Sequence, residues 1–328
     1  MPAVRIISWN IFNFAAGKNG VLSRADSTER MLEVVHPATG AAACDIFVII
    51  EPVTKKAKVG AIATGGGPTG GTQILGMLQS RATGGADWAV ADTLCIYSKT
   101  KGETVLVFYR TPVVTISAGP VLLSNVAAVM PNWRILNVRE SCPFHITFSL
   151  TGSGTTFELI AQHAPSPSYG HANNRKANVG VQQVGVHASV TGNTRVVYLG
   201  DLNLCGVPDP TLAPACDLTG HDDDRTTLNN LGMTLVAGED RSSLKKGAAQ
   251  YTTYREHAYD NILAKGHTAV ANAAVIDLIA PLITTYQLTK PGAIAANVFA
   301  SKLLFYKVRI GKNRGISDHL PIKVTVTF

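Results

Sequence analysis

The 328-residue sequence contains no apolar run long enough to cross a membrane as a helix. A membrane helix needs roughly 18 to 20 consecutive apolar residues, and the best candidate, residues 268–283, is interrupted by Asp277. No charged and then apolar leader precedes the first strand-like segment, so the sequence shows no secretory signal. We therefore expect a soluble protein without a membrane span, and an intracellular location is favoured if nothing has been removed ahead of Met1.

Cysteine is scarce and scattered. The five cysteines are odd in number and form no Cys-x-x-Cys pair, which argues against a zinc site and against a dense disulfide framework. Buried thiols are the simplest interpretation. A bridge between Cys205 and Cys216 stays open as an alternative in an oxidising compartment.

Charged residues make up only 16% of the chain, whereas hydrophobic residues make up 46%. This balance excludes an intrinsically disordered chain and supplies the apolar surface for a sizeable core. The 29 lysines and arginines exceed the 22 acidic residues, which leaves a net charge of +7. A basic surplus suits an anionic partner, and nucleic acid, a phosphorylated metabolite and an acidic membrane surface all remain open.

Glycine is concentrated in one segment, but without a nucleotide-binding motif. The cluster at residues 65–71 lacks the Gly-Lys-Ser/Thr ending of a phosphate-binding loop and the Gly-x-Gly-x-x-Gly spacing of a dinucleotide site. We predict a flexible surface loop, inserted over residues 60–85, because glycine-rich segments are typical of such loops. A second loop insertion is predicted over residues 281–315.

Strand-like segments outnumber helix-compatible ones. Residues 24–35 and 173–190 are compatible with helices, as is a shorter segment near residues 225–231. Apolar, β-branched runs that predict buried strands recur at residues 4–9, 45–50, 94–97, 105–109, 113–116, 145–150, 157–162, 195–199, 259–263 and 322–328. The pattern favours an α+β fold in which helices cover β-sheets that pack on each other.

Polar side chains occur where six of these strand-like segments end or begin. They are carboxylates, amides and imidazoles that a sandwich of sheets can bring to a common rim: Asn10, Glu51, His163, Asp201 with Asn203, Asp260, and Asp318 with His319. Taken singly, each has a simple structural explanation, such as a turn or a helix cap. Together they suit metal-assisted hydrolysis of a phosphate ester, and oxygen ligands without cysteine favour Mg²⁺, Mn²⁺ or Ca²⁺ over zinc.

Seven short blocks around these residues are similar to the motifs of the endonuclease/exonuclease/phosphatase superfamily, and within it to deoxyribonuclease I-like nucleases. In chain order the blocks are Ile7-Ser8-Trp9-Asn10, Ile49-Ile50-Glu51, Phe108-Tyr109-Arg110, Gln162-His163-Ala164-Pro165, Leu199-Gly200-Asp201-Leu202-Asn203, Tyr259-Asp260-Asn261-Ile262-Leu263 and Ile316-Ser317-Asp318-His319-Leu320-Pro321-Ile322. The resemblance implies a single domain over residues 1–328. Its fold would be a four-layer α/β/β/α sandwich of two packed mixed β-sheets flanked by helices.

The resemblance also implies a metal site and a phosphate site. Glu51 would be the principal ligand of a magnesium ion, with Asn10 and Asp318 completing or supporting the site. Asp201 and Asn203 would orient the attacking water and bind the scissile phosphate.

The same resemblance implies an acid–base pair. His319, polarised by Asp260, would accept the proton of the water. His163, held by Glu103, would donate a proton to the leaving alkoxide.

The implied activity is that of a DNA endonuclease that acts on double-stranded DNA as a monomer. Ala-Pro follows His163, which resembles the DNA nucleases, and Tyr109, Arg110 and Arg139 would contact the substrate together with Asn203. A phosphodiesterase for phospholipid head groups and an inositol-phosphate phosphatase remain alternatives. The DNA-contacting arginine expected after the metal-ligating glutamate is missing, and the lysines at positions 55 and 56 are candidates to replace it.

Overall fold

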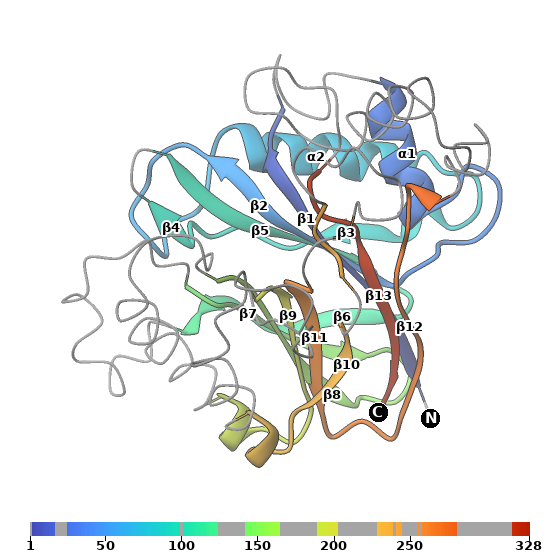
Figure 1. Cartoon of the computed structure of the whole chain (residues 1–328), viewed down its shortest axis with the longest axis vertical. Coiled ribbons are helices and arrows are strands. Elements are labelled where there is room, and N and C mark those ends of the chain that lie inside the picture. Colours follow the sequence, from blue (N-terminus) through green and yellow to red (C-terminus); the bar gives the residue numbers. More distant parts are fainter. Residues whose placement is uncertain are drawn as a thin grey trace.

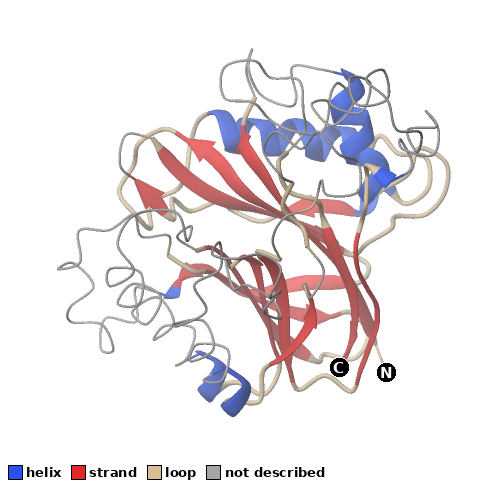
Figure 2. Ribbon diagram, viewed as in Figure 1, coloured by secondary structure: helices blue, strands red, loops and turns tan. Residues whose placement is uncertain are grey.

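The structure, a computed structural model, describes residues 2–16, 25–98, 101–123, 142–164, 189–202, 228–238, 241–244, 255, 258–280 and 317–328. Two mixed β-sheets pack face to face, and the helices α1 (Ala25–Val35) and α2 (Gly66–Gln79) lie on the outer face of one of them (Figures 1 and 2). A short 3₁₀ helix, η2, covers Gly85–Asp87. The α+β sandwich predicted from the sequence is confirmed.

The first sheet has the strand order β12-β13-β1-β2-β5-β3, with β4 paired to β5. Its strands are β1 (Ala3–Phe14), β2 (Ile46–Thr54), β3 (Trp88–Val90), β4 (Tyr97–Ser98), β5 (Gly102–Arg110), β12 (Ala269–Val275) and β13 (Ile322–Thr327). The second sheet has the order β10-β11-β9-β8-β7-β6. Its strands are β6 (Val114–Leu122), β7 (Phe144–Leu150), β8 (Thr156–His163), β9 (Val196–Asp201), β10 (Thr234–Ala237) and β11 (Asp260–Lys265).

Strand β2 shows how the sequence specifies the layers. Ile46, Val48 and Ile50 belong to the apolar core between the two sheets, whereas Phe47 and Ile49 belong to the core beneath the helices. Successive side chains of a strand point to opposite faces, so a strand that is covered on both faces needs an unbroken apolar run. The run is buried throughout.

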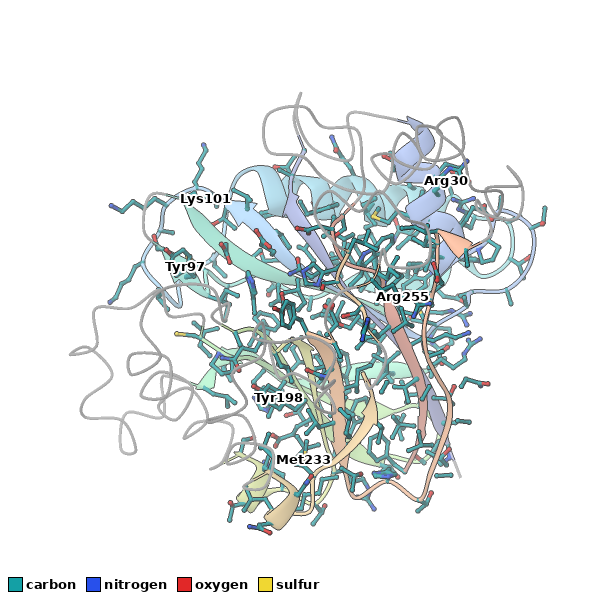
Figure 3. All side chains as sticks on the ribbon, in the orientation of Figure 1. Arg30, Tyr97, Lys101, Tyr198, Met233 and Arg255 are labelled. Atoms are coloured by element: carbon teal, nitrogen blue, oxygen red, sulfur yellow. The ribbon has the colours of Figure 1, made fainter. Side chains whose placement is uncertain are left out.

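The outer face of the second sheet is covered by a third apolar cluster. Tyr198 and Met233 belong to it (Figure 3), and Val190 and Leu228 reach it from two short helical turns. These two helical turns pack on the outer face of the second sheet.

Helix α2 corrects the prediction of a flexible loop over residues 60–85. A Cβ atom on Gly67 would lie 2.8 Å from Cβ of Pro52 on β2, and one on Gly71 would lie 2.9 Å from Cδ2 of Leu106 on β5. Glycine has low helix propensity, but at these positions the missing side chain lets the helix backbone approach the sheet closely. Tertiary packing therefore outweighs the local preference of the glycine cluster.

Other predicted elements agree with the structure in part. The helix predicted over residues 24–35 is confirmed by α1, whereas the strand predicted over residues 94–97 is reduced to β4. Strands β3, β10 and β12 were not predicted, and the largely exposed β12 consists of small uncharged residues without alternating hydrophobicity. The predicted helix over residues 173–190 lies mainly outside the described residues, and the loop over 281–315 lies wholly outside them. Of the helix predicted over residues 225–231, residues 228–231 are described, and 228–230 form a short helical turn. Within the described residues, no helix has the length and apolarity that a membrane crossing requires.

Candidate active site

Both sheets bring polar side chains to the same end of the sandwich. In the second sheet, Asp201 on β9 is in register with His163 on β8 and with Asp260 on β11. In the first sheet, Asn10 on β1 lies beside the residue that precedes Glu51 on β2. The Asn10 amide Nδ2 donates to Oδ2 of Asp201 at 2.8 Å, which links the two sheets at this end.

Asp201 lies between two imidazoles. Its Oδ2 atom is 3.8 Å from Nε2 of His163 and 3.8 Å from Nε2 of His319. The side chain is buried, and its Oδ1 atom has no hydrogen-bond partner among the described residues. Burial raises the pKa of Asp201, against the opposing effect of the positive charge on His319. A buried carboxylate flanked in this way is suited to orient a water molecule between two proton carriers.

His163 is held by a carboxylate from the opposite sheet. Its Nδ1 donates to Oε2 of Glu103, on β5, at 3.2 Å. Burial disfavours the charged imidazole, but the hydrogen bond to Glu103 and the charges of Glu51 and Asp201 outweigh this effect and raise the pKa of His163 to about 10. In the absence of a bound cation, His163 therefore carries a proton at neutral pH.

His319 has its own carboxylate partner. Its Nδ1 donates to Oδ2 of Asp260 at 2.7 Å. Burial opposes the charged imidazole, but the negative charges of Asp260 and Asp201 raise the pKa of His319 well above its usual value. Ser242 supports the pair, since its hydroxyl donates to the same Asp260 oxygen and accepts from the Asp260 backbone N–H. Trp9 Nε1 donates to the His319 carbonyl oxygen at 2.8 Å and fixes the backbone there.

Glu51 occupies an irregular point of β2. The register of β2 against β5 shifts between Ile50 and Val53, and Glu51 has a φ of 70°. This left-handed conformation is unfavourable for a residue with a side chain and recurs at functional sites. Glu51 is 8% exposed, and burial raises its pKa to about 7 despite the nearby positive charge of His163. The carboxyl group thus sits where its charged form lacks compensation, as expected of a cation ligand.

The donors around Glu51 fit a hard divalent cation. The neighbouring amide of Asn10 has a buried Oδ1 atom without a partner among the described residues, and the charge of Asp318 acts on both Glu51 and His319. Carboxylate and amide oxygens are the ligands that Mg²⁺, Mn²⁺ and Ca²⁺ prefer. In the described part of the chain, no group of three or more His, Cys, Asp or Glu side chains is arranged to hold a metal. The ligands that the resemblance implies, Glu51, Asp318 and Asn10, are two carboxylates and one amide, which is not a group of that kind.

Two residues predicted to contact the substrate lie elsewhere. Tyr109 is six residues along β5 from Glu103, roughly 20 Å at about 3.3 Å per residue, and therefore at the other end of the strand. Tyr109 packs edge-on against Phe148, and Arg110 donates to Asp87 at 2.8 Å. Strand direction and register separate both residues from the site, so the predicted substrate contacts are corrected.

Several other predictions concern residues outside the described part of the chain. Asn203 and Arg139 belong to this group, as does the alternative bridge between Cys205 and Cys216. The described cysteines, Cys44, Cys95 and Cys142, are buried and take part in no disulfide.

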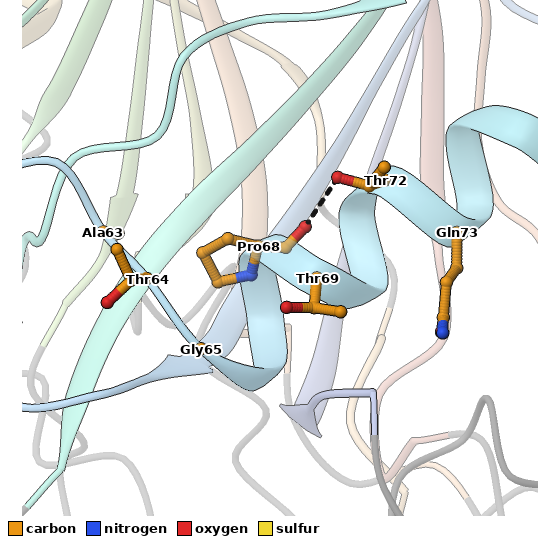
Figure 4. Close-up of a pocket in the computed structure, with 7 residues that line it drawn as sticks. All are labelled: Ala63, Thr64, Gly65, Pro68, Thr69, Thr72 and Gln73. Atoms are coloured by element: carbon orange, nitrogen blue, oxygen red, sulfur yellow. Dashed lines mark hydrogen bonds between the residues drawn. The ribbon is translucent and has the colours of Figure 1, made fainter.

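A pocket beside the start of α2 is separate from this site (Figure 4). It is lined by Ala63, Thr64, Gly65, Pro68, Thr69, Thr72 and Gln73. The Thr72 hydroxyl donates to the Pro68 carbonyl oxygen. None of these side chains titrates near neutral pH, so the lining offers no acid–base chemistry.

Two serines that support the site received no role from the sequence. Ser317 donates to the Asn10 carbonyl oxygen and accepts from the His319 backbone N–H. Its position directly before an Asp-His pair is a signal that points to it. Ser242 has no such signal, because the residues around it show no periodic pattern or motif.

No known protein-family profile matches the sequence, and no curated protein sequence matches it significantly. Solved structures do match. An endonuclease/exonuclease/phosphatase protein from Beutenbergia cavernae aligns with a TM-score of 0.59 and 14% identity, covering 100% of this chain and 72% of that chain. A mannosyl-6-phosphatase from Bacteroides thetaiotaomicron has a TM-score of 0.54 and 15% identity, with 99% and 100% covered. A 3′ phosphatase from Neisseria, bound to product DNA hairpin, has a TM-score of 0.51 and 16% identity, with 99% of each chain covered. The chain therefore has the fold of the endonuclease/exonuclease/phosphatase proteins.

Proposed function

We propose that this protein is a divalent-metal-dependent phosphodiester hydrolase. The observation that carries the proposal is the placement of Asp201 between two imidazoles, each bound by its own carboxylate. Hydrolysis of a phosphodiester needs one group that takes a proton from water and another that gives a proton to the leaving oxygen. Two histidines around one buried carboxylate supply both groups within a single small site.

The two histidines are proposed to have different roles. His163 holds a proton through Glu103 and donates it to the leaving oxygen. His319, oriented by Asp260, accepts the proton of the water that Asp201 positions for in-line attack. A divalent cation, when bound, would neutralise phosphoryl charge and lower the pKa values of the nearby imidazoles, which favours proton acceptance by His319.

DNA is the proposed substrate, and the implied cation is Mg²⁺. The block His163-Ala164-Pro165 resembles DNA nucleases, and the similar Neisseria structure is bound to a DNA product. A head-group phosphodiesterase is the second candidate. One observation favours it: exposed lysines and exposed apolar side chains share the loop of residues 55–62, which follows Glu51 on the same segment.

A nicking assay on supercoiled plasmid with Mg²⁺ tests the proposal. Asp201→Asn and His319→Ala should each lower turnover by at least about 100-fold, the usual scale for losing one acid–base group. EDTA should abolish activity, and Mg²⁺ or Mn²⁺ should restore it. His145→Gln is the matched control, because His145 bonds to Glu158 at 2.8 Å outside the site.

Parallel reactions with RNA, an abasic oligonucleotide, sphingomyelin and a phosphoinositide identify the substrate class. Plasmid nicking without lipid hydrolysis supports the DNA endonuclease. Lipid hydrolysis without nicking replaces it with the second candidate. Wild-type turnover in both site variants would refute the assignment of the site itself.

A further inference from the structure

A basic loop follows the end of β2, the strand that carries Glu51. Residues 55–62, here called the basic loop, read Lys-Lys-Ala-Lys-Val-Gly-Ala-Ile, and all three lysines are exposed. No acidic residue occurs in the sequence between Glu51 and Asp87. The loop therefore presents positive charge that its own chain segment does not compensate.

The basic loop also exposes apolar side chains. Ile62 is 62% exposed and Val59 is 37% exposed. The described residues contain five large hydrophobic side chains exposed to this degree, and two of them lie within this one loop. Single exposed apolar residues are common. A pair that directly follows three exposed lysines combines positive charge with apolar surface, as in segments that bind at a membrane interface.

Backbone hydrogen bonds hold the basic loop in this conformation. Gly60 N–H donates to the Cys95 carbonyl oxygen, and Cys95 N–H donates to the Ala61 carbonyl oxygen, each at 2.8 Å. Ile62 forms an isolated antiparallel bridge with Leu94. Because Ile62 is fixed by pairing on the neighbouring segment, its side chain cannot turn into the core without breaking these bonds.

The basic loop lies beside the active site. Lys55 is four residues beyond Glu51 on the same segment. The register of Thr54 with Gly102 places Lys101, the residue before Gly102, near the start of the basic loop (Figure 3). The positive charge of Lys101 reaches Glu51 and acts on it. A surface that engages the basic loop would therefore lie close to the segment that carries Glu51.

We propose that the basic loop docks the protein on a bilayer that contains anionic phospholipids. The lysines pair with the negatively charged head groups, while Ile62 and Val59 enter the apolar part of the interface. A nucleic-acid backbone would satisfy the lysines but would leave Ile62 in water, so charge and apolar exposure together favour the bilayer. Docking needs no turnover and stands apart from the proposed hydrolysis.

Vesicle co-sedimentation tests this proposal without any catalytic readout. The protein in EDTA is mixed with vesicles of phosphatidylcholine alone, or with phosphatidylcholine and about 30% phosphatidylserine, a content that gives the surface a negative potential. We expect binding to the anionic vesicles alone, weakened by salt because exposed charges are screened. Lys56→Gln and Lys58→Gln should each weaken binding about fivefold, and Ile62→Ser by at least about fivefold.

Matched controls separate docking from general surface effects. Lys323→Gln removes an exposed lysine on β13, and Val121→Ser removes an apolar side chain that is 47% exposed on β6. Both should bind the anionic vesicles as the wild type does, and circular dichroism should show that every variant is folded. Absence of binding to anionic vesicles would overturn the proposal. Equal binding by Ile62→Ser and the wild type would also overturn it, and would assign the lysines to a purely ionic partner such as nucleic acid. Loss of hydrolysis in the plasmid and lipid assays with intact vesicle binding would refute the proposed function alone.

Discussion

Replacing Ser242 by alanine should lower both the stability and the turnover of the protein, because the Ser242 hydroxyl makes two hydrogen bonds with one buried residue. The hydroxyl donates to Oδ2 of Asp260 and accepts from the Asp260 N–H at 3.1 Å, and both residues are fully buried. A hydrogen bond to a charged group contributes about 1.5–3 kcal/mol, and a buried donor left without a partner costs about 1–3 kcal/mol. Because these two contributions overlap, we expect the free energy of unfolding to fall by about 2–4 kcal/mol.

The same change should affect turnover through His319. Asp260 would keep its hydrogen bond to the imidazole but would lose the contact that orients its carboxylate. Loss of such supporting groups typically costs about 10–100-fold in activity. We expect kcat to fall by this factor with little change in KM, because Ser242 acts through Asp260. Ser242→Thr, which keeps a hydroxyl, should recover part of the loss.

Ser8→Ala is the matched control. Ser8 is also fully buried, but its hydroxyl has no hydrogen-bond partner within the described structure. Its removal should change the free energy of unfolding by less than about 1 kcal/mol and leave turnover unchanged. Denaturant unfolding and steady-state kinetics on the folded variants provide the measurements. Wild-type turnover in Ser242→Ala, or equal destabilisation by both alanines, would refute the reasoning.

Three further changes have defined outcomes. The rise in the Glu51 pKa to about 7 corresponds to about 3 kcal/mol, and the folded state takes up this proton more readily than the unfolded chain, so stability falls as pH rises from about 4.5 through 7. In chelator, the free energy of unfolding of Glu51→Gln should therefore exceed that of the wild type by about 3 kcal/mol at pH 8, and the two should be equal at pH 4. Equal free energies of unfolding at pH 8 would contradict this. His36 accepts a hydrogen bond from Trp88 Nε1, and burial lowers the His36 pKa. The stabilisation by neutral His36 is therefore complete above pH 6.5 and is lost as the pH falls below it. Unfolding followed by tryptophan fluorescence should show that the stability of His36→Asn falls less between pH 7 and acid pH than that of the wild type. Arg110→Ala removes the ion pair with Asp87 and should cost about 1–3 kcal/mol of stability with unchanged turnover per folded molecule; a loss of turnover would return Arg110 to the site.

The strands that were predictable from the sequence are those that consist of an unbroken apolar run or are buried on both faces. The run at residues 46–50 needs two covered faces, and the structure supplies them. Local pattern fails where packing overrides it. The glycine cluster of α2 predicts a loop, yet the segment is a helix, because Gly67 and Gly71 permit close contact with the sheet. The exposed, uncharged β12 carries no alternation, and pairing with β13 alone makes it a strand.

The residues of the candidate site were predictable where a polar side chain stands at the end of an apolar run. Glu51 and Asp201 each follow such a run, so their residue types stand out in the sequence. Tyr109 also follows an apolar run, and only the antiparallel direction of β5 places it away from the site. Ser242 has neither a motif nor a pattern, and only its contact with Asp260 identifies its role.

By itself, the sequence determined the side-chain chemistry and the set of strands that must be buried, because both depend on residue type and local periodicity. The tertiary structure alone decided which ends of the strands meet, and therefore which polar residues form one site. Asn10 and Asp201 show the reason: they are 191 positions apart, and the hydrogen bond between them exists only because two sheets pack in one particular register. Register and sheet packing depend on contacts between distant parts of the chain, and no local pattern records them.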